Sequence, residues 1–264
     1  MSRLLTWAVL GLSSLALPLL AHELKIFSSQ YHLDADTGKA TVYLSWGHRL
    51  PVDELTDAAT LDRYEWLSPA GKATTLKAEG KSLQANLVGG KEPGVYQVLA
   101  TRKPAVFSFV LDEEGQKQMK RGPRSEHAGA KVDSAIRSVQ SAKTLLCVGK
   151  PDDKAPAPAG LPLEIVPLQG PTSWKARNEM RFRLLLEGRP LPQSVVLARS
   201  LSFKPDNAWN YATYSDRKGE FTLVTETPGT WVIKVLAKRP ADPKQRGEFD
   251  EEWFTTTLSF EVRP

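Results

Sequence analysis

Short runs of alternating apolar residues recur along most of this chain at roughly ten-residue intervals, separated by turns that contain Gly or Pro. Examples of such turns are Ser68-Pro69-Ala70-Gly71, Glu92-Pro93-Gly94 and Asp216-Arg217-Lys218-Gly219. Alternation with period two is typical of strands that are buried on one face, and closely spaced turns favour antiparallel pairing over a parallel α/β sheet. The sequence therefore predicts an all-β protein made of sandwiches.

A Pro-rich and charge-rich stretch at residues 150–160 predicts a linker, since it has few apolar residues to bury. It separates residues 22–149 from residues 161–264, and each part is long enough for one β-sandwich. The second part has about seven strand patterns in about a hundred residues, the size of a transthyretin-like or immunoglobulin-like sandwich. In the first part we expect a short helix at residues 131–143, followed by a closing strand at residues 144–148.

Residues 1–21 have the pattern of a secretory signal peptide. Arg3 is followed by a mainly apolar run over residues 4–20, and Ala21 ends the segment. Pro18 and the lack of a basic stop signal favour cleavage over anchoring, so we expect a periplasmic protein without stable membrane insertion. Cleavage would lower the formal charge from +5 to +4, and without a basic run we expect no nucleic-acid partner. Cys147 is the only cysteine, so an intramolecular disulfide is excluded, and we expect it in a strand or core.

Two histidines fall at matching ends of two extended segments, residues 22–33 and residues 40–48. If these segments pair antiparallel, paired residue numbers sum to a constant near 70 to 74, which places His22 opposite positions 48–52. In the second segment Val42, Leu44, Trp46 and His48 share one face, so His48 ends a core face. Neutral imidazoles are common ligands of divalent transition metals, and the pair predicts half of a metal site.

Two further metal ligands are predicted, the α-amine of His22 and the imidazole of His127. Cleavage after Ala21 would leave His22 with a free α-amine, whose reference pKa of ~8 allows a metal to displace its proton. His127 lies in residues 112–130, a polar segment that we expect to be an exposed excursion able to carry a third imidazole toward the pair. The predicted metal ligands are thus His22, His48 and His127.

The order of short motifs along nearly the whole mature chain resembles the domain of unknown function 4198 family. The motifs that carry the resemblance are Ala21-His22, Gly47-His48, Lys143-Thr144-Leu145, Leu163-Glu164-Ile165-Val166-Pro167, Gly188-Arg189-Pro190-Leu191, Asp216-Arg217-Lys218-Gly219-Glu220-Phe221, Pro228-Gly229-Thr230-Trp231 and Leu258-Ser259-Phe260-Glu261-Val262.

This resemblance implies a periplasmic protein associated with nickel or cobalt uptake, acting as the soluble partner of a membrane transporter. It assigns the family's N-terminal histidine to His22 and its Gly-His to His48. The chain departs from the commoner pattern at Leu24-Lys25-Ile26 and Arg49-Leu50, where the family often has aromatic residues. The ligands are retained, but the departures leave the identity of the metal open.

Three functions follow from these observations. The first is capture of Ni(II) or Co(II) for a membrane transporter. The second is binding of Cu(II), which the same nitrogen ligands suit and which binds more tightly by the usual affinity order. The third is a metal-free structural or adhesive module. We expect no enzyme, since the chain has no Gly-x-Ser-x-Gly, Cys-x-x-Cys or His-Glu-x-x-His motif and no Gly-rich phosphate loop.

Overall fold

The computed structural model describes residues 22–150, 153–203 and 208–264, so the predicted signal peptide lies outside the described residues. The described chain consists of strands and of three 3-10 helices, η1 (Ala58–Thr60), η2 (Arg124–His127) and η3 (Pro171–Ser173). The all-β prediction is confirmed. Within these described ranges, no helix has the length and apolarity needed to cross a membrane.

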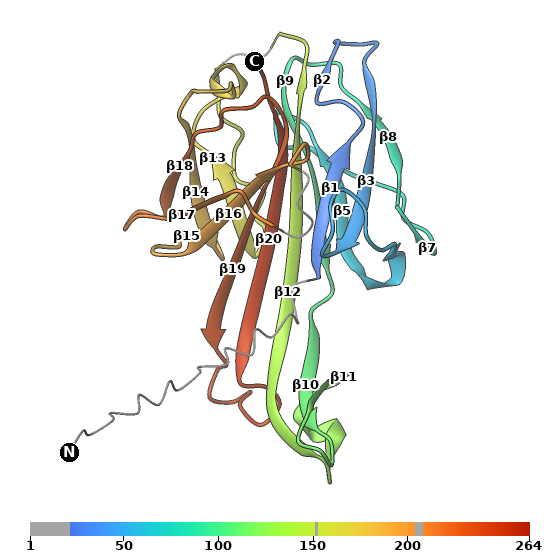
Figure 1. The fold of residues 1–264 in the computed structure, drawn as a ribbon. Helices are drawn as coiled ribbons and strands as arrows, with labels where there is room; N and C mark the ends of the chain where they lie inside the picture. The colour runs from blue at the N-terminus through green and yellow to red at the C-terminus, as the bar shows by residue number, and fades with distance from the viewer. Residues whose placement is uncertain (1–21, 151–152, 204–207) are drawn as a thin grey trace, which may run out of the picture.

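The largest sheet has eleven strands and extends across the molecule (Figure 1). Its main path is β17 (Tyr211–Tyr214), β16 (Val195–Ser200), β19 (Gly229–Pro240), β20 (Glu251–Val262), β12 (Lys131–Val148), β9 (Gly94–Arg102), β5 (Leu61–Leu67) and β6 (Ala73–Thr75). Off this path, β2 (His32–Leu33) and β10 (Ala105–Leu111) pair with β12, and β11 (Lys117–Arg121) pairs with β10. Its pairs are antiparallel except that β12 is parallel to β20 and to β2.

Three smaller sheets complete the fold. One contains β1 (Glu23–Ser28), β3 (Lys39–Gly47) and β8 (Asn86–Gly89). Another contains β13 (Leu163–Pro167), β14 (Met180–Leu186), β15 (Arg189–Pro190) and β18 (Glu220–Leu223). The third pairs β4 (Thr56–Asp57) with β7 (Lys81–Ser82). In Figure 1 the first two lie on either side of the long strands β12 and β20.

Strand β12 has buried side chains on both of its faces. Leu145 and Cys147 belong to the core that packs against the β13–β14 sheet. Leu146 and Val148, which alternate with them, belong to the core under the β1–β3 sheet. Because successive side chains of a strand point to opposite faces, β12 separates two cores and contributes to each. The large sheet thus continues across the predicted linker and is shared by the two predicted domains.

The expectation of a helix at residues 131–143 is wrong, since this stretch is the first part of the 18-residue strand β12. It pairs with β10 on one side and with β20 on the other. Ala, Lys and Gln in this stretch favour a helix by intrinsic preference, but pairing on both edges overrides such a weak preference. Cys147 is buried in this strand, as expected, and burial raises the pKa of its thiol to about 12.

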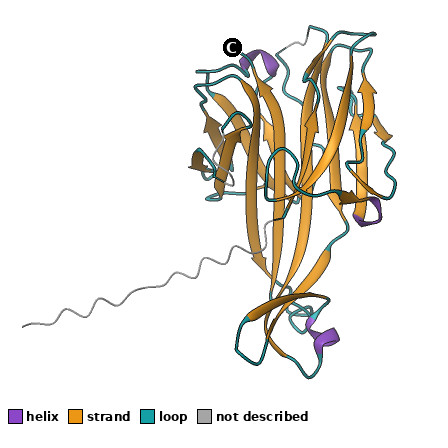
Figure 2. Cartoon of the chain, turned by 45° about the vertical axis from the view of Figure 1, so that its right-hand side comes forward, coloured by secondary structure: helices purple, strands orange, loops and turns teal. Residues whose placement is uncertain are grey.

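The predicted excursion at residues 112–130 is an ordered projection. Strands β10 and β11 form a hairpin, and together with η2 they project beyond the main body beside the ends of β12, β19 and β20 (Figures 1 and 2). All five residues of β11 are exposed. We refer to residues 105–130 as the arm.

The described part of the predicted linker is held against the first part of the chain in several ways, one of which is the Glu164 carboxylate of β13. Glu164 is buried with Lys143, whose ammonium nitrogen lies 2.6 Å from its Oε1 atom. The same carboxylate accepts hydrogen bonds from the backbone N–H groups of Ala159, Gly160 and Leu161. Hydrogen bonds to three consecutive amides fix the path of the chain into β13.

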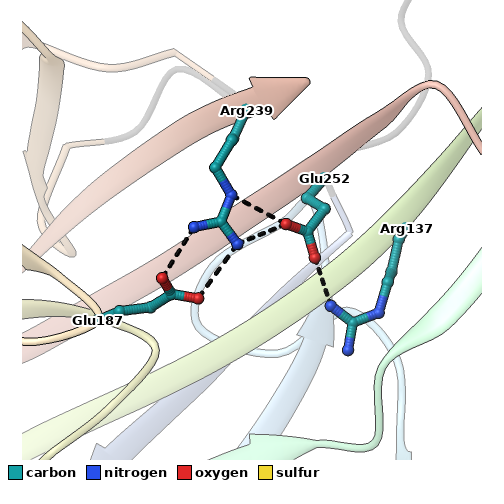
Figure 3. A network of polar contacts seen from close by, with 4 residues as sticks. All are labelled: Arg137, Glu187, Arg239 and Glu252. Atoms are coloured by element: carbon teal, nitrogen blue, oxygen red, sulfur yellow. Dashed lines mark hydrogen bonds and ion pairs between the residues drawn. The ribbon is translucent and has the colours of Figure 1, made fainter. Parts of the chain in front are cut away.

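A second polar network connects the long strands to the turn between β14 and β15 (Figure 3). Arg239 of β19 donates to both carboxylate oxygens of Glu187 in that turn, at 2.8 and 3.1 Å. Its Nε atom also donates to Glu252 of β20, at 2.9 Å, and Glu252 accepts from Arg137 of β12. This alternating chain of charges connects three adjacent strands of the large sheet to the smaller sheet that covers them.

Candidate metal-binding site

The pairing of β1 with β3 brings His22 and His48 together. Their register runs from Glu23 opposite Gly47 to Ser28 opposite Val42, so paired numbers sum to 70 and the predicted register is confirmed. His22 and His48 follow at the same end of this pair. Their ring centroids are 4.3 Å apart with an interplanar angle of 62°. The strand pairing thus places the two imidazoles in contact.

The turn that follows β3 fixes the backbone at His48. Gly47 has a φ of +117°, which L side chains rarely adopt, and a Cβ atom there would lie 2.5 Å from Oδ2 of Asp53. That Oδ2 atom accepts hydrogen bonds from the backbone N–H groups of His48 at 2.7 Å and of Arg49 at 3.1 Å. The glycine and the carboxylate together hold the turn, while the His48 side chain remains exposed.

His22 is partly buried against Trp46 and Glu54. Its ring centroid lies 4.3 Å from that of Trp46 at an interplanar angle of 75°, and its Nε2 atom lies 3.6 Å from a carboxylate oxygen of Glu54. Burial lowers the pKa of His22, the neighbouring His48 lowers it further, and Glu54 opposes this shift. The environment favours the neutral imidazole, which is the form that binds metals.

A buried lysine lies beneath the strand end. Lys25 donates a hydrogen bond from Nζ to the carbonyl oxygen of Gly47 at 2.6 Å. Burial lowers its pKa to about 8. The adjacent Glu23 is buried and forms an ion pair with Lys234 of β19, which anchors the start of β1 to the large sheet.

His127 is not beside the histidine pair. It is in η2, at the end of the arm, whereas the pair lies where β1 begins on the main body (Figures 1 and 2). Two contacts tie η2 to the loop between β19 and β20: the Ser125 hydroxyl with Glu248 at 2.5 Å and the Arg124 guanidinium with Asp250 at 2.7 Å. The prediction that His127 swings over the pair has no support in this placement.

The side chains at this site supply two imidazoles and a nearby carboxylate. Among the described residues, no group of three or more His, Cys, Asp and Glu side chains is arranged to hold a metal ion. A third nitrogen donor therefore depends on the His22 α-amine, and cleavage after Ala21 falls outside the described residues. The sequence interpretation did not place Asp53 and Glu54 at this site. An acidic pair five and six residues after His48 could have indicated carboxylates near the histidines.

The comparisons with known proteins give a family. A family model described as "Domain of unknown function (DUF4198)" matches residues 19–239. The chain belongs to the DUF4198 family. The match begins just before His22 and continues through β19, so the DUF4198 unit includes strands on both sides of the predicted linker.

Other comparisons add structural likenesses to this DUF4198 chain. Among solved structures, the D0-D1 domain of Intimin is similar over 92% of this chain and 98% of that chain, with 13% identity and a TM-score of 0.23. The D00-D0 domain of Intimin is similar over 90% and 98%, with 11% identity and a TM-score of 0.19. No curated protein matches the chain.

Proposed function

We propose that this DUF4198 protein is a periplasmic metal-binding protein. It captures a divalent transition metal, Ni(II) or Co(II), and supports its uptake by a membrane transporter. The observation that carries this proposal is the contact between the His22 and His48 rings, whose centroids are 4.3 Å apart. The choice of nickel or cobalt and the transporter partner rest on the family resemblance of the sequence.

The available donors suit a borderline metal ion. Imidazole nitrogen is preferred by Ni(II), Co(II), Cu(II) and Zn(II), whereas Ca(II) and Mg(II) prefer oxygen. The lowered pKa of His22 keeps its ring in the binding form. With the signal peptide removed, the His22 α-amine lies on the same residue as one imidazole and adds a chelating nitrogen.

The exposure of the site fits a carrier better than a structural metal centre. His48 is exposed, and the side chain of His22 is 35% exposed. Structural metal sites are enclosed by a complete set of protein ligands, whereas a cargo ion must enter and leave. An accessible pair with few protein ligands allows exchange with a second protein.

Copper is the second candidate for the bound metal. The same two imidazoles bind Cu(II) more tightly than Ni(II) by the usual affinity order. Affinity alone therefore cannot name the metal in the cell, and a comparison of several metals is part of the test.

The test is metal titration by calorimetry, with Ni(II), Co(II), Cu(II) and Zn(II), of protein that begins at His22. We expect one-to-one binding that weakens at least tenfold, about 1.4 kcal/mol, in His48→Ala. One extra residue before His22 should weaken binding as well. His32→Ala is the matched control, because His32 is on β2, where its ring pairs with Glu261 of β20 and not with the histidine pair.

Two results would contradict metal binding by the histidine pair. One is the absence of binding by the wild-type protein, which would favour a metal-free structural or adhesive module. The other is equal binding by wild type and His48→Ala. Consumption of a reductant with oxygen by the copper-loaded protein would indicate a redox enzyme in place of a carrier.

A further inference from the structure

A cavity of about 370 Å³ is lined by residues at the base of the arm and by Trp46, the residue that contacts His22. Its lining residues come from the end of β3, from β4 and η1, from the end of β9 and from β10, β11 and β12. The arm leaves the main body at these strands (Figure 1). Ser138 and Gln140 of β12 line it, and they alternate with the residues of β12 that face the other core. The cavity is therefore on the same face of the large sheet as the β1–β3 sheet.

The charge of this cavity is mainly positive. Arg102, Lys103 and Arg121 line it, and Asp57 is the acidic residue among them. In the part of the chain that the structure describes, none of the ion pairs involves Arg102 or Arg121. Lys103 donates to the carbonyl oxygen of Ala59 at 3.0 Å. Two guanidinium groups thus face a cavity without a carboxylate bound to either.

The environment of Arg102 indicates that an anion would be stabilised there. Burial lowers the pKa of its guanidinium, and the nearby Arg121 lowers it further, while Asp57 and Glu54 oppose the shift. Arginine remains charged under all ordinary conditions, so these effects appear as unfavourable electrostatic energy in the folded protein. A bound anion would relieve it.

Trp46 connects the cavity to the histidine pair. The Arg102 guanidinium lies over its ring at 4.3 Å, and the His22 ring lies 4.3 Å from it as well. The indole N–H donates to Oε1 of Gln140 at 3.1 Å, which fixes the ring. Phe107 adds a second aromatic side chain to the lining. The Trp46 ring therefore contacts Arg102 of the cavity and His22 of the histidine pair.

We propose that this cavity binds a small polycarboxylate, and that the metal ion is captured as its carboxylate complex. The carboxylates pair with Arg102 and Arg121, while the ion binds His22 and His48; this inference rests on the proposed function. Guanidinium groups bind planar carboxylates through two parallel hydrogen bonds. Imidazole suits the divalent transition metals, so His22 and His48 would bind the ion at coordination positions that the carboxylates leave open.

The test uses citrate as the probe, titrated by calorimetry into protein that begins at His22, alone and as its one-to-one complex with Ni(II). We expect citrate alone to bind the wild type, and to bind at least tenfold more weakly to Arg102→Gln and to Arg121→Gln. Because Arg121 is exposed, its replacement should leave the fold intact. Arg217→Gln, in a distant turn, makes the same change of charge and should bind like wild type. Asp57→Asn should bind citrate several-fold more tightly, because it removes a negative charge from the cavity. The Asn side chain can still cap η1, so the fold should be kept.

The outcomes separate this inference from the proposed function. Metal binding without citrate binding would overturn the carboxylate site and leave the proposed function standing. Citrate binding that survives in both arginine variants would do the same. Citrate binding that is lost in these variants, in a protein that binds no metal, would support the cavity as a carboxylate site and overturn the joint capture. Equal affinity for phosphate and citrate would overturn the assignment to carboxylates. The Ni(II)–citrate complex should bind more tightly than either component, and His48→Ala should remove that gain.

Discussion

The buried pair of Lys143 and Glu164 yields a prediction about which partner the fold depends on more. The two side chains are each 1% exposed, and their charged atoms are 2.6 Å apart. Glu164→Ala leaves a buried ammonium without its carboxylate, a change that typically costs about 3–5 kcal/mol. It also removes the acceptor of three backbone N–H groups, although Gly160 is exposed and its amide can bond to water.

Lys143→Met has a milder expected effect. It leaves the Glu164 carboxylate with its three backbone donors, and a carboxylate that accepts several N–H bonds remains stabilised in its charged form. We expect Glu164→Ala to lower the free energy of unfolding by ~4 kcal/mol and Lys143→Met by roughly half of that. Urea denaturation followed by tryptophan fluorescence measures both values.

The control is Glu79→Ala, because Glu79 pairs with Lys77 on the surface, where both side chains are about four-fifths exposed. Such a pair contributes about 0.5 kcal/mol or less. Equal losses in Glu164→Ala and Lys143→Met, or a larger loss in Lys143→Met, would refute the argument that the three amides depend on the carboxylate. A loss in Glu164→Ala no larger than in Glu79→Ala would refute the buried pair itself.

Three further predictions concern the strand end and the core. The pKa of Lys25 is about 8 in the folded protein against an ordinary 10.5, so between these pH values the unfolded chain binds more protons than the folded protein. The free energy of unfolding of the wild type should therefore rise from pH 8 to pH 10 relative to that of Lys25→Met, with Lys218→Met as the control. The same difference between wild type and Lys25→Met at both pH values would contradict this prediction. Gly47→Ala should destabilise by ~1–3 kcal/mol in urea denaturation and weaken metal binding, because of the φ of +117° and the contact with Asp53; a neutral effect on both would count against the turn as described. Cys147 should react with a thiol reagent only as fast as the protein unfolds, and rapid labelling of the native protein would contradict its burial.

The parts of this protein that were predictable from sequence are local. The alternation of Val42, Leu44, Trp46 and His48 indicated which face of β3 is buried, and the connection at residues 29–38, which includes β2, limited the register with β1. Both features lie within about 25 residues of each other, so few pairings were possible. The contact between His22 and His48 follows from them.

The parts that were missed depend on contacts between distant segments. Residues 131–143 were expected to be helical because nothing nearby in sequence indicates the pairing with β20, about 115 residues away. The position of His127 depends on Glu248 and Asp250, at separations above 120 residues. The cationic cavity draws its lining from several strands, so no short motif marks it. In each case the relevant partner is supplied by topology.

The parallel pairing of β12 with β20 also sets an order in which the fold can be completed. The chain is made, and would be exported, N-terminus first, so β12 emerges long before β20. Until residues 251–262 have emerged, one edge of β12 has no partner strand, and the core against the β13–β14 sheet lacks the β20 side chains. Pairing across such a separation requires loop closure before its contacts can stabilise the fold, and such non-local pairing slows folding. During this interval the β1–β3 hairpin, whose contacts are local, can form while the large sheet is unfinished. The chain therefore has a delay between synthesis and completion, during which its long central strand is open to chaperones or to aggregation.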